Sequence, residues 1–187
     1  MKLRKWVSKL GKIGILSKEK RILLTIDLLL EKLLLRIIIM YINKKLIFLN
    51  IESRGKRELL EYLCDKLEQA GTVASASEFF QAIWEREETF STGIGRNVAI
   101  PHGKCACVKE TKILVAILPK GVDYEALDGE PVNILFMFAV PLGRDKEYMS
   151  LLSKVTTFVR AESNRKKLLD AGNEQELFQQ IREVIND

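Results

Sequence analysis

Two runs of nearly uninterrupted apolar residues constrain the fold of this chain more than any other feature. They are Lys112–Leu118 (KILVAIL) and Val132–Val140 (VNILFMFAV). Their length and their content of β-branched residues are typical of β-strands. A strand with one face in solvent alternates apolar and polar residues, and neither run does, so both faces should be buried. We therefore expect helices on each side of a sheet, with a turn at Asp128-Gly129 between the two strands.

Helical periodicity precedes and follows these strands. Leucines recur at three-to-four spacing through Lys56–Ala70, and Gly71 follows at the expected helix end. Ser75 and Asn173 each precede a periodic apolar segment and have a glutamate three residues later, which is the sequence pattern of a capping box. These patterns predict one helix over 56–70 and further helices that begin after Ser75 and after Asn173.

The remaining segments complete an α/β pattern with one sheet. A helix is predicted over Tyr148–Val159, and strands are predicted within Ile42–Ile51 and over Val98–Ile100. Four residues should form the apolar side of that helix: Met149, Leu152, Val155 and Val159. The order of elements predicts a single α/β domain.

The positive charge of the chain is confined to its first 50 residues. They hold 12 Lys+Arg and 3 Asp+Glu, whereas residues 51–187 hold 18 and 22. The larger part is mildly acidic, so we expect no nucleic-acid partner. We divide the chain into a basic, apolar N-terminal extension at 1–41, whose role the sequence does not reveal, and a domain at 42–187.

Residues 22–42 are the most apolar stretch of the sequence. Four charged side chains interrupt it, namely Asp27, Glu31, Lys32 and Arg36. Each would cost about 2–3 kcal/mol near the centre of a bilayer. The stretch therefore predicts a buried or partner-facing helix, with a helix at a membrane surface or across a membrane as alternatives. No secretory signal is evident and the cysteine count is odd, so we expect a cytoplasmic protein.

His102, the only histidine, lies in a setting suited to chemistry. Pro101 favours an extended Ile100, so a strand should run directly to the imidazole, which we expect in an exposed loop. Gly103 removes a side chain beside the ring, and Gly93 and Gly95 allow the backbone to come close to an anion. An unprotonated imidazole is a good nucleophile near neutral pH.

Nucleotide binding has no support in the sequence. Neither a G-x-x-x-x-G-K-[ST] loop nor a G-x-G-x-x-G turn is present. If His102 carries a phosphoryl group, that group should come from another protein. Nothing in the sequence predicts an organic cofactor or a metal ion.

Glu87–Gly103 (EETFSTGIGRNVAIPHG) closely resembles the phosphohistidine signature of enzyme IIA domains of the fructose/mannitol class of the sugar phosphotransferase system. The matching positions are Glu87, then Ile94-Gly95, then the run from Val98 to His102. Beyond the signature, the resemblance extends from about Ile42 to Ile185, whereas residues 1–36 match nothing in the family.

The resemblance implies a mixed β-sheet flanked by helices on both faces. It implies that Nε2 of His102 accepts a phosphoryl group from the phosphocarrier HPr or a relative. The group would then pass to a cysteine of an enzyme IIB partner, coupled to sugar uptake. Any contact with the membrane would come through the transporter complex or the N-terminal extension. Arg86 matches the family arginine that supports the phosphorylated site, in keeping with guanidinium binding of phosphate oxygens. From its residue type alone, Arg86 could equally form a surface ion pair.

Two other functions remain open on the same residues. A regulatory relative of the nitrogen-related branch would use the same phosphohistidine to control binding to other proteins. A binding module without catalysis is the third reading, because many family members have a second histidine where this chain has Tyr148. Tyrosine can still donate an O–H to a phosphate oxygen, but it supplies neither imidazole chemistry nor a cation.

Cys105 and Cys107 follow the histidine closely. His102-x-x-Cys105-x-Cys107 offers three soft ligands within six residues, which makes a zinc or redox site conceivable. A closed structural zinc site needs four ligands, and Cys64 lies in a predicted helix far along the chain. We therefore expect two ordinary reduced cysteines.

Overall fold

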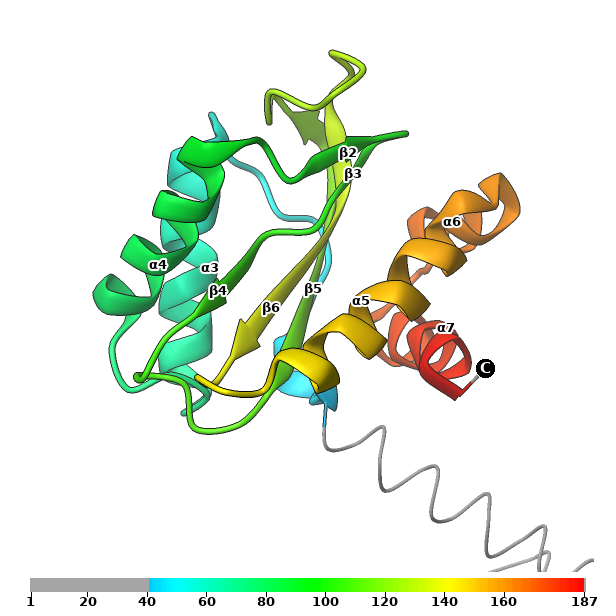
Figure 1. Ribbon diagram of the computed structural model, residues 1–187. Coiled ribbons are helices and arrows are strands. Elements are labelled where there is room, and N and C mark those ends of the chain that lie inside the picture. The colour runs from blue at the N-terminus through cyan, green and yellow to red at the C-terminus, as the bar shows by residue number, and fades with distance from the viewer. Residues whose placement is uncertain (1–40, 187) are drawn as a thin grey trace, which may run out of the picture. The chain divides into compact units, whose positions relative to one another are not determined.

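The computed structural model describes residues 41–186, which form a six-stranded sheet with helices packed on both faces (Figure 1). All of the N-terminal extension except Tyr41, and nearly all of the apolar stretch 22–42, lie outside the described residues. Within the described range, no helix has the length and apolar character needed to cross a membrane.

The sheet is organised around two long central strands. β5 (Lys112–Val122) pairs antiparallel with β6 (Val132–Val140), and β1 (Ile47–Phe48) pairs parallel with the outer edge of β5. The other edge of β6 is shared by two short strands, β3 (Val98–Ala99) and then β4 (His102–Lys104), both parallel to β6. β2 (Gly93–Gly95) pairs antiparallel with β3 and ends the sheet. The predicted mixed sheet is therefore confirmed.

The predicted strand bounds agree with the observed ones to different degrees. β6 has the expected bounds, and β5 continues past the predicted Leu118. The strand predicted within Ile42–Ile51 is much shorter than that segment, because Asn43 accepts a hydrogen bond from the amide of Lys45 and starts a 3-10 turn, η1 (Lys44–Leu46). Only two residues remain for β1.

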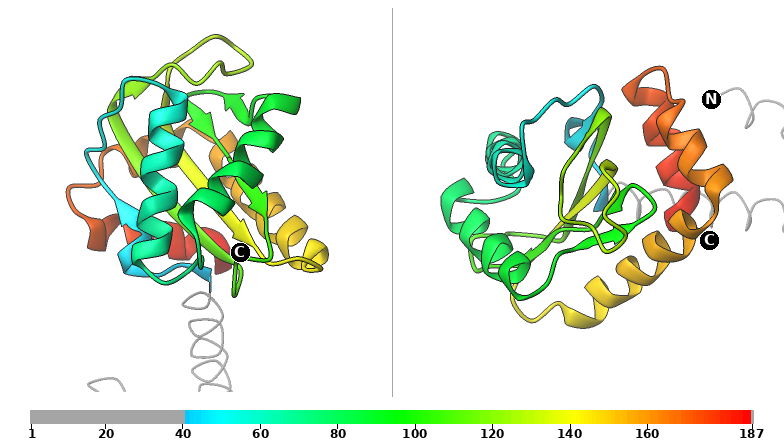
Figure 2. Two further views of the ribbon diagram at one scale, coloured as in Figure 1. Left: turned by 90° about the vertical axis from the view of Figure 1, so that its left-hand side faces the viewer. Right: turned by 90° about the horizontal axis from the view of Figure 1, so that it is seen from above.

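Both faces of β5 and β6 are buried, as the apolar runs predict. Along β5, alternate residues enter separate clusters, so that Leu114 lies on one face and Ile113 and Val115 lie on the other. One face is covered by α3 (Lys56–Gln69) and α4 (Ala76–Thr89). The other is covered by α5 (Asp145–Arg160), α6 (Glu162–Leu169) and α7 (Glu174–Asn186), as the view from above shows (Figure 2). The predicted helices on both faces are confirmed.

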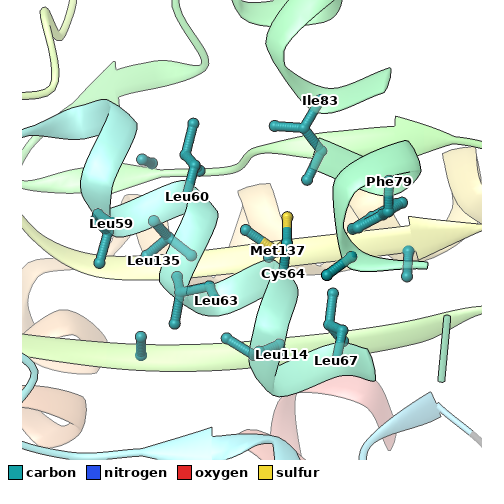
Figure 3. Close-up of a cluster of buried hydrophobic side chains, with 14 of the residues drawn as sticks. Leu59, Leu60, Leu63, Cys64, Leu67, Phe79, Ile83, Leu114, Leu135 and Met137 are labelled. Carbon is teal, nitrogen blue, oxygen red and sulfur yellow. The ribbon is translucent and has the colours of Figure 1, made fainter. Parts of the chain in front are cut away.

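The core beneath α3 and α4 comes from the predicted leucine pattern. Leu59, Leu60, Leu63 and Leu67 of α3 are fully buried and point to the strands, where they lie near Leu114, Leu135 and Met137 (Figure 3). Phe79 and Ile83 of α4 close the same cluster. The helix α4 is thereby held against the sheet by its apolar side, which sets the position of its C-terminal turn.

The predicted helix caps are present. Ser75 accepts a hydrogen bond from the amide of Glu78 at 3.2 Å, and Asn173 accepts one from the amide of Glu176 at 2.9 Å. The buried side of α5, however, differs from the prediction. Tyr148 is buried with Leu151, whereas Met149 is 58% exposed. The ring of Tyr148 packs edge-on against Phe138 of β6 at 5.8 Å, and this contact turns the next residue toward solvent.

A buried carboxylate connects α4 to three other segments. Glu87 lies 2.9 Å from the ammonium of Lys56 at the start of α3, and it accepts hydrogen bonds from the hydroxyl of Tyr124 at 2.9 Å and the amide of Thr92 at 3.0 Å. The hydroxyl of Thr92 also donates to it. Burial, and then the charge of Glu87, raise the pKa of Tyr124, so its hydroxyl stays a donor. Every oxygen of this carboxylate is therefore satisfied.

We expect Glu87→Gln to lower the free energy of unfolding by about 3 kcal/mol, because it removes the buried charged partner of Lys56 and leaves that ammonium only the exposed carboxylate of Glu125 at 3.2 Å. Urea unfolding measures this loss. Glu61→Gln is the matched control, since its carboxylate pairs with Arg57 in an exposed setting and should contribute under about 1 kcal/mol. Equal losses in the two variants would contradict a stabilising role for the buried carboxylate.

Candidate active site

His102 is the first residue of β4, and it is half-buried rather than placed in an exposed loop as the sequence suggested. The chain does run extended to the imidazole, but it continues pairing beyond Pro101. The amide of Phe138 donates to the carbonyl of Pro101 at 2.9 Å, and His102 then pairs with Phe138 in register. β4 pairs with β6 alone among the described strands, so its other edge faces outward.

Two hydrogen bonds select one tautomer of the imidazole. Nδ1 of His102 lies 3.0 Å from the carbonyl oxygen of Ile100, which can only accept, so Nδ1 carries the proton. Nε2 lies 3.1 Å from Nε of Arg86, which can only donate, so Nε2 presents its lone pair. Both contacts therefore favour the same tautomer, with Nε2 as the unprotonated nitrogen.

Arg86 is brought to the imidazole by the packing of α4 beside β4 (Figure 1). It lies in the last turn of α4, where its Nη1 also donates to the carbonyl of Phe90 at 2.7 Å. With one nitrogen bonded to the imidazole and another to this carbonyl, the guanidinium is held at two points. The structure thus joins the two residues that the sequence analysis singled out 16 positions apart.

The surroundings lower the pKa of His102. Burial is the main cause, and it is opposed by the hydrogen bond to Ile100. The charges of Arg86 and Lys104 lower the pKa further, while Glu87 raises it. The imidazole is therefore neutral around pH 7, which is the nucleophilic form.

Tyr148, which stands where many family members have a second histidine, lies against His102. The two ring centroids are 5.3 Å apart and tilted by 35°. Burial raises the pKa of Tyr148, and the charge of Arg86 lowers it in part. The phenol consequently stays protonated near neutral pH and can act as a hydrogen-bond donor.

Of the three glycines proposed for the site, only Gly103 lies beside the histidine. A Cβ at Gly103 would be 2.9 Å from Ile83 and 3.0 Å from Phe79, so its lack of a side chain lets α4 approach β4. A Cβ at Gly93 would meet Ala126 at 2.8 Å. Gly95 has φ +81° and packs against Asp128. Gly93 and Gly95 therefore serve the packing of the β2–β3 hairpin on the segment after β5.

The cysteines differ from the expectation of two reduced thiols, because Cys105 and Cys107 are joined by a disulfide. The candidate zinc ligands also differ from those that the sequence suggested. Glu78, not His102, completes the group with the two cysteines, and its carboxylate lies 3.4 Å from the sulfur of Cys105. Sulfurs that are bonded to each other are not thiolate ligands. Burial raises the pKa of Cys64, which remains a buried thiol.

Lys104 is a residue that the sequence reasoning did not single out. It follows His102 by two positions in β4, and its charge acts on the imidazole. A prediction of β4 as a strand would have found this residue, because side chains two positions apart in a strand lie on the same face.

Comparison with known proteins identifies the family of this chain. The family model described as "Phosphoenolpyruvate-dependent sugar phosphotransferase system, EIIA 2" matches residues 40–184. The fructose-specific EIIABC component of Bacillus subtilis is 37% identical over 145 residues, which cover 78% of this chain and 22% of that protein. The fructose-specific EIIA component of Haloferax volcanii is 31% identical over 141 residues, which cover 75% of this chain and 92% of that protein.

The fold is shared with a solved relative of another branch. The crystal structure of the nitrogen regulatory protein IIA-Ntr from Neisseria meningitidis superimposes with a TM-score of 0.70 at 30% identity, covering 77% of this chain and 95% of that one. Because the family model matches most of the chain and relatives of similar length share its sequence and fold, this protein belongs to the EIIA 2 family of the phosphoenolpyruvate-dependent sugar phosphotransferase system.

Proposed function

We propose that this protein is a phosphocarrier whose His102 accepts a phosphoryl group on Nε2 from an HPr-like carrier and passes it to a cysteine of an enzyme IIB partner. The observation that carries the proposal is the position of Nε2, which is unprotonated and faces the guanidinium of Arg86 at 3.1 Å. Uptake of a sugar of the fructose/mannitol class would follow from the onward transfer.

In the accepting step, the lone pair of Nε2 attacks the phosphorus of the donor phosphohistidine. The new N–P bond forms as the donor N–P bond breaks, and the bonding pair returns to the donor nitrogen. The proton on Nδ1 stays hydrogen-bonded to the carbonyl of Ile100, which offsets the charge that develops on the ring. Arg86 would exchange its bond to Nε2 for bonds to the phosphoryl oxygens. The second transfer reverses these roles, with a thiolate sulfur as the acceptor.

A regulatory phosphoprotein is the second candidate, favoured by the likeness to the nitrogen regulatory protein from Neisseria. The accepting step would be the same and only the downstream partner would differ. The name of the Bacillus relative, a fructose-specific EIIABC component, favours transfer toward a sugar-specific IIB partner. Transfer from the phosphorylated protein to a purified fructose-class IIB domain separates the two, since a purely regulatory protein would keep its label.

The pKa of His102 should lie below 6.5, because burial and two nearby cations disfavour the imidazolium. As the chain has a single histidine, its ring protons give unambiguous NMR signals that can be followed against pH. We expect the rate of phosphoryl acceptance to be constant above the midpoint of that titration and to fall as the pH drops through it. A midpoint at or above 6.5 would contradict the site described above.

His102→Gln should abolish acid-labile labelling from phosphoenolpyruvate through enzyme I and HPr, because the nucleophilic nitrogen is lost. Glutamine keeps a polar side chain in the half-buried strand position.

Arg86→Ala should slow labelling about 100-fold and leave some acceptance, as expected when one cationic hydrogen-bond donor is lost. Arg57→Ala, which removes an arginine from the surface of α3, should label like wild type. Full labelling of His102→Gln would show that His102 is not the phosphoryl acceptor.

Tyr148→Phe should slow transfer roughly tenfold if the phenol donates a hydrogen bond to a phosphoryl oxygen. The ring packing against Phe138 is retained in this variant, so the fold should persist. Stopped-flow transfer from phospho-HPr measures the rate, and Tyr62→Phe on α3 serves as the control. An unchanged rate would mean that Tyr148 acts only through its packing, and an inactive wild type would favour a binding module without catalysis.

A further inference from the structure

Lys104 and His102 project to the same side of β4. Successive side chains of a strand point to opposite faces, and Gly103 between them faces Phe79 and Ile83 of α4. The partners of His102 and Lys104 in β6 are Phe138 and Val140, which belong to the cluster under α5. The ammonium of Lys104 therefore lies on the α5 side of the histidine, whereas Arg86 comes from α4.

One aromatic ring links the lysine to the histidine. The ammonium of Lys104 lies 5.6 Å from the centroid of Tyr148, and the imidazole of His102 lies 5.3 Å from the same centroid. Tyr148 is neutral, so it supplies no positive charge of its own beside the imidazole. Lys104 is near enough for its charge to lower the pKa of His102, as that of Arg86 does.

Lys104 forms an exposed ion pair that can be exchanged for another one. Its ammonium forms an ion pair with Asp145, the first residue of α5, and this contact lowers the pKa of Asp145. The side chains are 43% and 62% exposed, so water can replace either partner at small cost. Lys104 is thus held beside the imidazole without being buried in a fixed pair.

We propose that Lys104 is a second cationic ligand for the phosphoryl group on His102, held ready by Asp145 and transferred from that carboxylate when the imidazole is phosphorylated. This inference rests on the proposed function. A phosphoryl group carries about −1.5 to −2 charges at neutral pH against −1 for a carboxylate, so it competes well for the ammonium. Arg86 and Lys104 would then contact the phosphoryl oxygens from opposite sides of β4.

The exchange gives the phosphorylated protein a different surface. Asp145 loses its cation when Lys104 turns to the phosphoryl group, so a free carboxylate appears at the N-terminus of α5. A partner that docks on this end of α5 could thereby distinguish the two states. The feature depends on Asp145 and Lys104 being neighbours across the β4–α5 gap, which their ion pair establishes.

The test uses the full chain phosphorylated on His102 with phosphoramidate, a small chemical donor that needs no protein partner. The charges of Arg86, Glu87 and Lys104 act on His102, and the ring of Tyr148 lies against it. The ³¹P NMR signal is followed against pH to give the pKa of the phosphoryl group. Lys104→Gln should raise this pKa by about half a unit, because a cation that favours the dianion is lost. Asp145→Asn should lower the pKa of the phosphoryl group, because Asp145 no longer competes with that group for the ammonium of Lys104.

Lys120→Gln is the matched control, since Lys120 pairs with Glu52 in an exposed ion pair near the far end of β5. It should leave the phosphoryl pKa unchanged. Lys104→Gln matching wild type, or shifts of the same sign in Lys104→Gln and Asp145→Asn, would overturn the inference. Both variants change exposed residues, and a urea midpoint like that of wild type excludes unfolding.

The outcomes also separate this inference from the proposed function. If phospho-HPr fails to label wild type but the lysine-dependent shift is present after phosphoramidate, the carrier function fails and the inference stands. If phospho-HPr labels wild type and Lys104→Gln has the wild-type pKa, the carrier function stands and the inference fails. A wild type that forms no phosphohistidine with either donor overturns both.

Discussion

The pairing of β5 with β6, buried on both faces, is the constraint on which the rest of the structure depends. β6 offers its free edge to two short strands in succession, and the break between them falls at Ile100-Pro101. Proline has no amide hydrogen, so the chain cannot continue one unbroken ladder through this position. Next to this break, the carbonyl of Ile100 accepts from the imidazole two residues later, and this contact sets the tautomer of His102.

The position of Arg86 depends on how α4 is packed against the rest of the domain. The absence of a side chain at Gly103 allows Ile83 and Phe79 to seat α4 against β4. One residue beyond the arginine, the buried carboxylate of Glu87 ties the same turn to α3 and to the segments around Thr92 and Tyr124. An apolar contact and a satisfied buried ion pair thus act on successive turns of one helix. Together they hold the guanidinium at hydrogen-bond distance from Nε2.

Features with local causes could be predicted from the sequence. The bounds of β6 follow from an uninterrupted apolar run, and the caps at Ser75 and Asn173 from hydrogen bonds within three residues. Family resemblance brought His102 and Arg86 together as candidates, and the structure places them in contact. The family and the fold expected from the resemblance are confirmed.

Features that arise from contacts between distant segments could not be predicted. The exposure of Met149 depends on Tyr148 packing against Phe138, and the half-burial of His102 depends on β4 pairing with β6. The contact of Glu78 with Cys105 likewise joins the end of β4 to the start of α4. Helical periodicity narrows the buried side of α5 to neighbouring positions, but it does not choose between residues 148 and 149.

The outward edge of β4 has a consequence for how the protein behaves in a crowded solution. An unpaired strand edge is a template on which another chain can add a strand and begin to aggregate. Here the edge is only three residues long, contains a glycine and ends at a lysine, all of which discourage such pairing. The imidazole of His102 can therefore lie at this edge without making the edge a template for strand addition by copies of the same chain.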